Sequence, residues 1–357
     1  MFNMSVSVRP FGTLPSGAAV SLYTMTNASG ASVSMTDYGA IVTAIRVPDR
    51  NGVLGDVCLG FDNLEKYAGP HGSMGDTIGR YGNRIGKGLL TIGGTTYQLA
   101  LNDHGVNHLH GGNEGFNRKF WEVTVTEEAD RDTLAFHTIS PDGDENYPGT
   151  LDVTVCYSWD RDNNLIIRYQ ATTDADTVVN MTNHAYFNLA GHNSGSIRGH
   201  RVTIDADVIT DVDAELIPRG SYMPVLGTPL QMDGSFTLGE GLDRMESCPQ
   251  MLPAHGYDHN FVLRKGLAVG RAASVTEEST GRRMDVITDQ PAVQLYTACT
   301  THLEGGKDGA VYEPYCGFCL ETQHCPDSPN NPQFPGTTLL RPGETYDTTT
   351  IYAFRTF

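Results

Sequence analysis

Apolar and polar residues alternate with a period of two along much of the chain. In residues 151–159, "LDVTVCYSW", Leu151, Val153, Val155, Tyr157 and Trp159 share one parity, and smaller or polar residues take the other. A second alternating run, "NLIIRYQAT", follows the short polar turn "DRDN". Because successive side chains of a strand point to opposite faces, the two runs predict a β-hairpin.

The same alternation recurs in "HRVTIDAD", "RMDVITD" and "AVQLYTA", and clusters of Gly, Pro, Asn and Asp separate the runs. Helical periodicity is nearly absent, and the best short candidates are "DNLEKYAG" and "LEGGKDGAVYE". Many strands at short spacing indicate an all-β sandwich or barrel. No repeat and no linker-like change of composition interrupts the pattern, so we expect a single domain over residues 1–357.

Composition narrows the range of ligands. The chain has 42 acidic and 24 basic residues among 357, and its formal charge is -18. Nucleic acids and anionic membranes both reward clustered Lys and Arg, so this balance argues against either partner. It also makes a phosphorylated substrate less attractive, and a neutral polar ligand fits most easily. No stretch approaches the roughly 18 apolar residues that span a bilayer.

The chain contains seven cysteines, and its first residues, "MFNMSVSVRPFGTL", lack the basic and apolar regions of a signal peptide. We therefore expect a cytoplasmic protein with free thiols. Cys316, Cys319 and Cys325, with His324, raise the alternative of a zinc site. A structural zinc site usually has two well-spaced pairs of ligands, and a single C-x-x-C supplies half of that. The alternative of ordinary thiols is therefore preferred, with no metal.

Residues 183–191, "NHAYFNLAG", predict a strand with two different faces. Ala185, Phe187 and Leu189 fall on one face, and His184, Tyr186 and Asn188 fall on the other. A histidine in such a strand is often only a buried residue satisfied by one neighbour. Here Tyr186 and Asn188 share the face with the histidine, so this face is a candidate functional site.

Residues 318–323, "FCLETQ", repeat this division around an acidic residue. Cys319, Glu321 and Gln323 share the face opposite Phe318 and Leu320. Burial of a carboxylate is unfavourable unless it is paired or hydrogen-bonded. Burial also raises the pKa of a carboxyl group towards the range useful for a general base. A structural ion pair is the alternative to that catalytic role.

Further polar residues lie on predicted strand faces or in glycine-rich loops. They are Gln294 and Tyr296 of "AVQLYTA", Asp258 of "GYDHNFVL", His108 and His110 of "VNHLHGG", and Arg80, Asn83 and Arg84 of "GRYGNRIGKG". Carboxylates and amides bind hydroxyl groups, and aromatic rings stack on sugar rings. The set is typical of a sugar site with a general acid and a general base.

At these residues the sequence resembles the aldose 1-epimerase family, the galactose mutarotases. The resemblance runs along nearly the whole chain, and "TNHAYFNLAG" and "GFCLETQHCPDSPNNPQFP" are its most specific parts. It implies a large antiparallel β-sandwich, a supersandwich of galactose mutarotase type, with an open sugar cleft and no required cofactor. Tyr81 and Gly82 depart from the small apolar residues of many members.

The resemblance also implies roles for individual residues. Glu321 matches the general base, His184 the general acid, and His110 a second active-site histidine. Residues that match substrate ligands, or lie beside the site, are Asn83, Arg84, Tyr186, Asp258 and Gln294. In the implied reaction, ionised Glu321 takes the proton of the anomeric hydroxyl and protonated His184 donates to the ring oxygen. A nearby carboxylate, or the pair itself, is expected to raise the pKa of His184.

Three other activities compete with this interpretation. A hexose-phosphate epimerase of the same fold needs extra basic residues at the cleft. A non-catalytic sugar-binding module needs no paired acid and base. A glycoside hydrolase usually uses two carboxylates about 5 to 9.5 Å apart, whereas the clearest partner of Glu321 is a histidine. The expected partner is therefore a small aldose sugar, with the protein a monomer or a homodimer.

Overall fold

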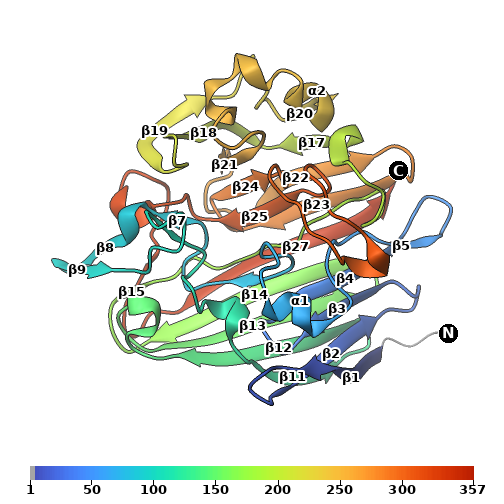
Figure 1. The fold of residues 1–357 in the computed structure, drawn as a ribbon, viewed down its shortest axis with the longest axis horizontal. Coiled ribbons are helices and arrows are strands. Elements are labelled where there is room, and N and C mark those ends of the chain that lie inside the picture. The colour runs from blue at the N-terminus through green and yellow to red at the C-terminus, as the bar shows by residue number, and fades with distance from the viewer. Residues whose placement is uncertain (1–4) are drawn as a thin grey trace.

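The computed structural model describes residues 5–357 and consists mainly of antiparallel β-sheet (Figure 1). Its largest sheet has nine strands, and the last strand of the chain lies in the middle of it. In spatial order these strands are β11 (Glu122–Glu127), β12 (Arg131–Ser140), β13 (Leu151–Asp160), β14 (Asn164–Thr173), β27 (Tyr346–Thr356), β23 (Arg282–Thr288), β22 (Gly270–Glu277), β17 (Arg201–Ile204) and β20 (Asp233–Thr237).

Two five-stranded sheets accompany the nine-stranded sheet. The first contains β1 (Ser5–Thr13), β2 (Ala19–Thr26), β3 (Ser32–Thr36), β4 (Val42–Pro48) and β5 (Leu54–Asp56). The second has the order β19 (Pro218–Pro224), β18 (Ala206–Val212), β21 (Asp258–Leu263), β24 (Ala292–Tyr296) and β25 (Cys319–Gln323).

Short elements connect and cover the sheets. The strand pairs are β6 (Thr77–Ile78) with β16 (Thr182–Asn183), β7 (Arg84–Ile85) with β10 (His108–Leu109), β8 (Leu89–Ile92) with β9 (Thr95–Gln98), and β15 (Thr177–Val178) with β26 (Leu339–Leu340). The α-helices are α1 (Leu64–Ala68) and α2 (Leu238–Leu242). Within residues 5–357, no helix is long and apolar enough to cross a membrane.

The main hydrophobic core lies between the nine-stranded sheet and the two five-stranded sheets. Val155 and Ile167 of the nine-stranded sheet belong to the same buried cluster as Val33 of β3 and Leu295 of β24. Tyr352 of β27 also donates from its hydroxyl to the backbone oxygen of Leu320 at 2.8 Å, which ties two sheets together. This arrangement confirms the predicted antiparallel β-sandwich.

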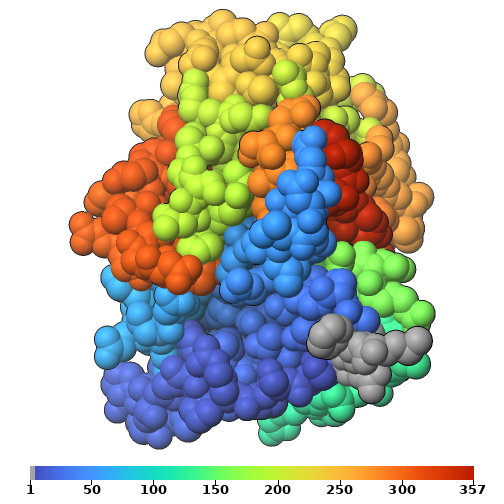
Figure 2. Space-filling view, turned by 90° about the vertical axis from the view of Figure 1, so that its right-hand side faces the viewer, coloured from blue at the N-terminus to red at the C-terminus, as the bar shows by residue number. Residues whose placement is uncertain are grey.

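In Figure 2, which views the molecule from the side, the N-terminal strands, in blue, lie low on the visible face. The yellow segment, which includes α2, caps the opposite end.

Several local predictions are confirmed. The predicted hairpin is β13 paired antiparallel with β14, and "DNLEKYAG" contains α1. Asn63 begins that helix, because its side chain accepts a hydrogen bond from the backbone N–H of Lys66. All seven cysteines are free thiols. Within residues 5–357, no group of three or more His, Cys, Asp or Glu side chains at metal-ligand spacing includes a cysteine.

Two local predictions are wrong in part. The stretch "LEGGKDGAVYE" forms only a 3₁₀ turn at Lys307–Gly309, since glycines interrupt it. Residues 183–191 are not one strand, because β16 ends at Asn183 and the chain then continues through isolated bridges at Phe187. The alternation of faces nevertheless persists: Ala185 and Leu189 lie in the main core, opposite the side chain of His184.

Candidate active site

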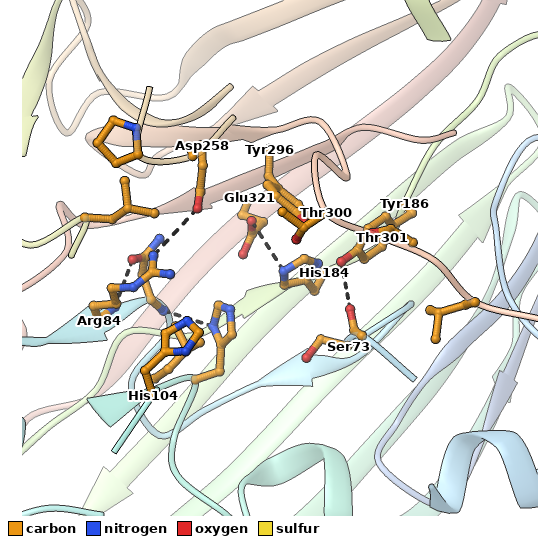
Figure 3. A pocket seen from close by; sticks show the side chains of 18 of the residues that line it. Ser73, Arg84, His104, His184, Tyr186, Asp258, Tyr296, Thr300, Thr301 and Glu321 are labelled. Carbon is orange, nitrogen blue, oxygen red and sulfur yellow. Dashed lines mark hydrogen bonds and ion pairs between the residues drawn. The ribbon is translucent and has the colours of Figure 1, made fainter. Parts of the chain in front are cut away.

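A cavity of about 510 Å³ opens at the edge of the second five-stranded sheet (Figure 3). Polar residues from that sheet form one wall, and loops far away in the sequence form the other. The lining residues are Gly72, Ser73, Asn83, Arg84, His104, Leu109, His110, His184, Tyr186, Leu216, Pro253, Ala254, Asp258, Tyr296, Thr300, Thr301, His302, Leu303 and Glu321.

The register of three strands brings the wall residues together. Asp258 of β21 lies opposite Tyr296 of β24, which lies opposite Cys319 of β25. In the neighbouring row, Gln294 lies opposite Glu321. Directly opposed residues in an antiparallel pair share a face. The alternation seen in "AVQLYTA" and "FCLETQ" therefore places these polar side chains on one surface.

Glu321 lies at the bottom of the cavity, with its side chain only 2% exposed. Its Oε1 is 3.7 Å from Nε2 of His184, and its Oε2 has no hydrogen-bond partner within the described chain. Burial raises the pKa of Glu321 well above its ordinary value. The charge of Asp258 adds to this shift, and that of Arg84 opposes it. The expected rise in the pKa of this carboxyl group is confirmed.

His184 directly follows β16, which ends at Asn183, and it also lines the cavity. Its ring stacks on Tyr186, with the ring centres 5.1 Å apart, and its Nδ1 lies 3.4 Å from the sulfur of Cys319. Burial lowers the pKa of His184 below its ordinary value, and the carboxylates of Asp76 and Asp258 only partly offset this effect. The expectation of a raised pKa at His184 is therefore wrong, because loss of solvation outweighs the nearby negative charge.

Together, these shifts determine how many protons the pair holds. A protonated Glu321 beside a neutral His184 carries one proton, and so does a carboxylate beside an imidazolium. The two arrangements differ only in which atom of the 3.7 Å contact holds that proton. Coupled groups of this kind titrate as a pair. Between the loss of its first and of its second proton, the pair therefore holds one proton that can be transferred.

His110 completes the group on the loop side. The backbone N–H of Asn83 donates to its Nδ1 at 3.1 Å, so the neutral ring carries its proton on Nε2. Burial lowers the pKa of His110 well below its ordinary value, and the charges of His184 and Arg84 add to this shift. His110 is therefore a neutral hydrogen-bond donor to the cavity.

Ring and carboxylate atoms of His110, His184 and Glu321 lie within 4.8 Å of one another, a spacing that could hold a metal ion. A histidine that binds metal through Nε2 needs its lone pair there and its proton on Nδ1. In His110 the proton is on Nε2, because Nδ1 already accepts the N–H of Asn83. This tautomer disfavours the group as a metal site.

Arg84 and Asp258 form the polar end of the cavity. Nε of Arg84 donates to Asp103 at 2.8 Å, and its Nη1 lies 3.7 Å from Asp258. Gln294 donates to Asp258 at 2.6 Å from behind, and it does not line the cavity. Asp258 is thus held from two sides, with Gln294 as its support.

The other predicted residues divide into two groups. Asn83 and Tyr186 line the cavity, and the hydroxyl of Tyr186 donates to the carbonyl of Gly72 at 2.7 Å. His108 does not reach the cavity, since its ring contacts the hydroxyl of Tyr147 and the backbone oxygen of Ala100. Arg80 is also absent from the lining, because its guanidinium bonds to backbone oxygens elsewhere.

Some lining residues were not singled out from the sequence. They are Ser73, His104, Thr300, Thr301, His302 and Leu303, together with Asp103, which supports Arg84. All belong to loops, where no periodicity assigns a side chain to a face. Cys319 was assigned to the face of Glu321, but its contact with His184 depends on how two distant segments pack.

Comparisons with known proteins show the family of the chain. Residues 21–353 match the aldose 1-epimerase family, and the chain belongs to it. It is 42% identical to the galactose mutarotase of Homo sapiens, covering 98% of each chain. It is 36% identical to the aldose 1-epimerase of Escherichia coli (strain K12), covering 95% of this chain and 96% of that one.

A solved structure of the galactose 1-epimerase from Lactobacillus acidophilus NCFM superimposes with a TM-score of 0.85. It is 26% identical in sequence, and 99% of each chain is covered. The structure of a homologue from C. elegans gives a TM-score of 0.84 over the same share of each chain.

Proposed function

We propose that this chain is an aldose 1-epimerase that interconverts the α and β anomers of free hexoses such as galactose and glucose. The single observation that carries the proposal is the Glu321–His184 pair. These two groups from distant segments meet at 3.7 Å within a polar cavity. The membership of the family and its close relatives supports the same activity.

The reaction follows from one proton shared by two groups. When a sugar hydroxyl donates to Glu321, the carboxylate form is favoured, and the shared proton passes to His184. Glu321 then accepts the proton of the anomeric hydroxyl while His184 donates to the ring oxygen. The C1–ring oxygen bond breaks and leaves an open-chain aldehyde. After rotation about C1–C2, the reverse transfers close the ring on the other face.

The surrounding residues hold the sugar during these transfers. The Nε2 proton of His110 is available to a sugar oxygen, and Arg84 and Asp258 offer a donor and an acceptor. Asn83 positions His110 through its backbone N–H, and Gln294 positions Asp258. Tyr186 and Tyr296 provide aromatic surface beside His184. The proposal assigns all the chemistry to side chains, without a cofactor.

A phosphorylated sugar fits this cavity less well. Arg84 is the only Lys or Arg among the lining residues, and Asp103 and Asp258 already neutralise its charge. We also propose a cytoplasmic monomer or homodimer that works as one domain. With a net charge of -18, it should show no affinity for nucleic acid or anionic membranes.

Polarimetry tests the proposal directly. Freshly dissolved α-galactose and α-glucose are followed with and without the protein, and with galactose 6-phosphate as a third substrate. We expect faster mutarotation of the free sugars and little effect on the phosphate. Binding of sugar without any acceleration would instead make the protein a sugar-binding module.

A further inference from the structure

Another buried histidine, His71, lies outside the cavity lining, and the proposed mechanism does not use it. His71 and Asp76 are 2% and 0% exposed, and Nε2 of His71 lies 2.7 Å from Oδ1 of Asp76. Nδ1 of His71 lies 2.9 Å from the carbonyl oxygen of Gly69. The other carboxylate oxygen of Asp76 accepts from the amide of Asn117 at 2.6 Å.

The partners of His71 determine its charge. When Asp76 is ionised, its Oδ1 and the carbonyl oxygen of Gly69 both accept, so both ring nitrogens of His71 donate. The pair is then an imidazolium next to a carboxylate, with no net charge. Burial acts to lower the pKa of His71, but Asp76 and the carbonyl of Gly69 outweigh it, and the pKa is raised.

The turn between these two residues holds His184 in place. The backbone N–H of His184 donates to the carbonyl of Asp76 at 2.9 Å, and the N–H of Gly75 donates to the carbonyl of His184 at 3.0 Å. Gly75 adopts a φ of +84°, and a Cβ there would lie 2.0 Å from the carbonyl oxygen of Val42. The turn is thus wedged between β4 and the segment that carries His184.

The same turn also holds the ring that stacks on His184. Tyr186 donates to the carbonyl of Gly72, and its ring lies 5.1 Å from that of His184. Moreover, Asp76 contributes the largest of the charge effects that favour protonated His184.

We infer that His71 and Asp76 form a charged positioning pair, which closes this turn and so fixes His184 for proton transfer. The inference rests on the proposed function, because it needs His184 to be the acid. Neither residue lines the cavity, so the pair acts through His184 and does not touch the sugar.

Other charged or titratable groups face the two histidines, and they are the same in the variants proposed below. Around His71 these are Tyr67 of α1 and Arg118 of the neighbouring 3₁₀ turn. Around His184 they are Glu321, Cys319, Asp258, His110, Tyr186 and Tyr296.

Asp76→Asn tests the pair with little change of shape. The new amide can accept from His71 through its oxygen and face Asn117 with its NH₂, if the Asn117 amide turns to present its oxygen. We expect kcat for galactose mutarotation to fall roughly 10- to 100-fold, with KM nearly unchanged. We also expect the kcat–pH profile to move to lower pH by at most roughly one unit. Asp76 favours the proton on His184 more strongly than the charge of His71 opposes it, so loss of both charges lowers the pKa of His184.

His200→Gln is the matched control. His200 is equally buried, contacts the same segment by accepting the N–H of Leu189, and lies outside the cavity lining. It should lower the melting temperature without moving the pH profile. If Asp76→Asn behaves like this control, with an unmoved profile and a wild-type kcat for the folded fraction, the pair is merely structural and the inference is wrong.

A measurement on the wild-type protein keeps the test independent of variant folding. With ¹⁵N-labelled histidine, NMR at pH 8 should show one ring with both nitrogens protonated and slow exchange of its N–H protons. Absence of such a ring would overturn the inference. Before each of these experiments, the wild-type protein is shown to accelerate mutarotation. A wild type without this activity would contradict the proposed function itself and not the inference about His71 and Asp76.

Discussion

Each of two sheets carries one buried glutamate, and the two residues differ in nearly every physical respect. Glu277 ends β22 in the nine-stranded sheet and accepts hydrogen bonds from the backbone N–H groups of Ser279 and Thr280 and from the Thr280 hydroxyl. Burial acts to raise the pKa of Glu277, but these bonds outweigh it and lower the pKa to about 2. At Glu321 of the five-stranded sheet, burial dominates and the pKa is raised.

The difference shows that, in one fold, a buried glutamate can either stabilise the structure, as Glu277 does, or remain available for chemistry, as Glu321 does. Glu277 has local donors two and three residues away, so the folded state satisfies its charge. Glu321 has an unpartnered Oε2 and a histidine at 3.7 Å, so its charge remains available to a substrate. Polar groups left unsatisfied in this way destabilise the fold. Such atoms also occur in the nine-stranded sheet, at Asp132, Arg282 and Thr348, but of these residues Glu321 is the one that lines the cavity.

The largest expected effect comes from Glu321→Gln. Removal of the proposed base should lower kcat for mutarotation by about 10²–10⁴-fold, while the melting temperature should not fall. Polarimetry and thermal unfolding check the two parts. Glu304→Gln, an exposed acidic residue near the cavity, is the control and should leave both unchanged. A near-normal rate for Glu321→Gln would remove Glu321 from the proposed mechanism.

The stability of Glu321→Gln relative to wild type should also depend on pH. The pKa of Glu321 is higher in the folded protein than in the unfolded chain, so the folded state binds more protons between the two values. Its contribution to stability therefore falls as the pH rises above the ordinary value of 4.5. The free energy of unfolding of Glu321→Gln, relative to wild type, should increase with pH over this range in urea titrations.

A core substitution in the nine-stranded sheet should lower stability and leave the catalytic rate unchanged, the reverse of Glu321→Gln. Leu165 of β14 is fully buried in the main core. Leu165→Ala should lower the free energy of unfolding by about 2–5 kcal/mol, measured by urea titration, with kcat of the folded protein unchanged. Leu226→Ala, at a side chain that is 79% exposed, is the control and should have little effect. A large loss of kcat in Leu165→Ala would show that the two sheets are not functionally separate.

Glu277→Gln should lower the free energy of unfolding by a smaller amount, and this loss should depend on pH. The folded pKa of about 2 lies below the ordinary value of 4.5, so the stabilisation is complete above 4.5 and disappears as the pH falls towards 2. At pH 7 we expect a loss of roughly 1.5–3 kcal/mol, as for hydrogen bonds to a charged group. Glu278→Gln, at an exposed neighbour, is the control. Equal losses for Glu277→Gln at pH 7 and pH 3 would contradict this account.

The smallest expected effect is that of metal removal. Dialysis against EDTA should leave mutarotation unchanged, because His110 presents a proton and not a lone pair to Glu321 and His184. Polarimetry before and after dialysis measures this. A loss of activity that returns with added Zn²⁺ would make the five-stranded sheet a metal centre.

The sequence predicted the strand faces better than the strands themselves. Glu321 and His184 were assigned to polar faces correctly, although residues 184–191 form no continuous strand. Alternation survives there because extended backbone keeps a period of two even without a ladder of hydrogen bonds. Loop residues such as Thr300 and Asp103 were missed, since a loop has no period from which a face can be inferred.

The charge states were the least predictable feature. The pKa of His184 was expected to rise, yet burial lowers it. Similarly, nothing in the sequence marks His71 and Asp76 as an ion pair, because each looks like an ordinary polar residue in the glycine-rich stretch "HGSMGD".

Local pattern was thus enough to establish an antiparallel β-sandwich and the kinds of side chain available for catalysis, because backbone periodicity acts between neighbours. Tertiary packing determines which of those side chains lie in contact and which of them are protonated. Those properties depend on distance and solvation across segments as remote as His184 and Glu321. The acid–base pair exists only when both segments are folded against the same cavity.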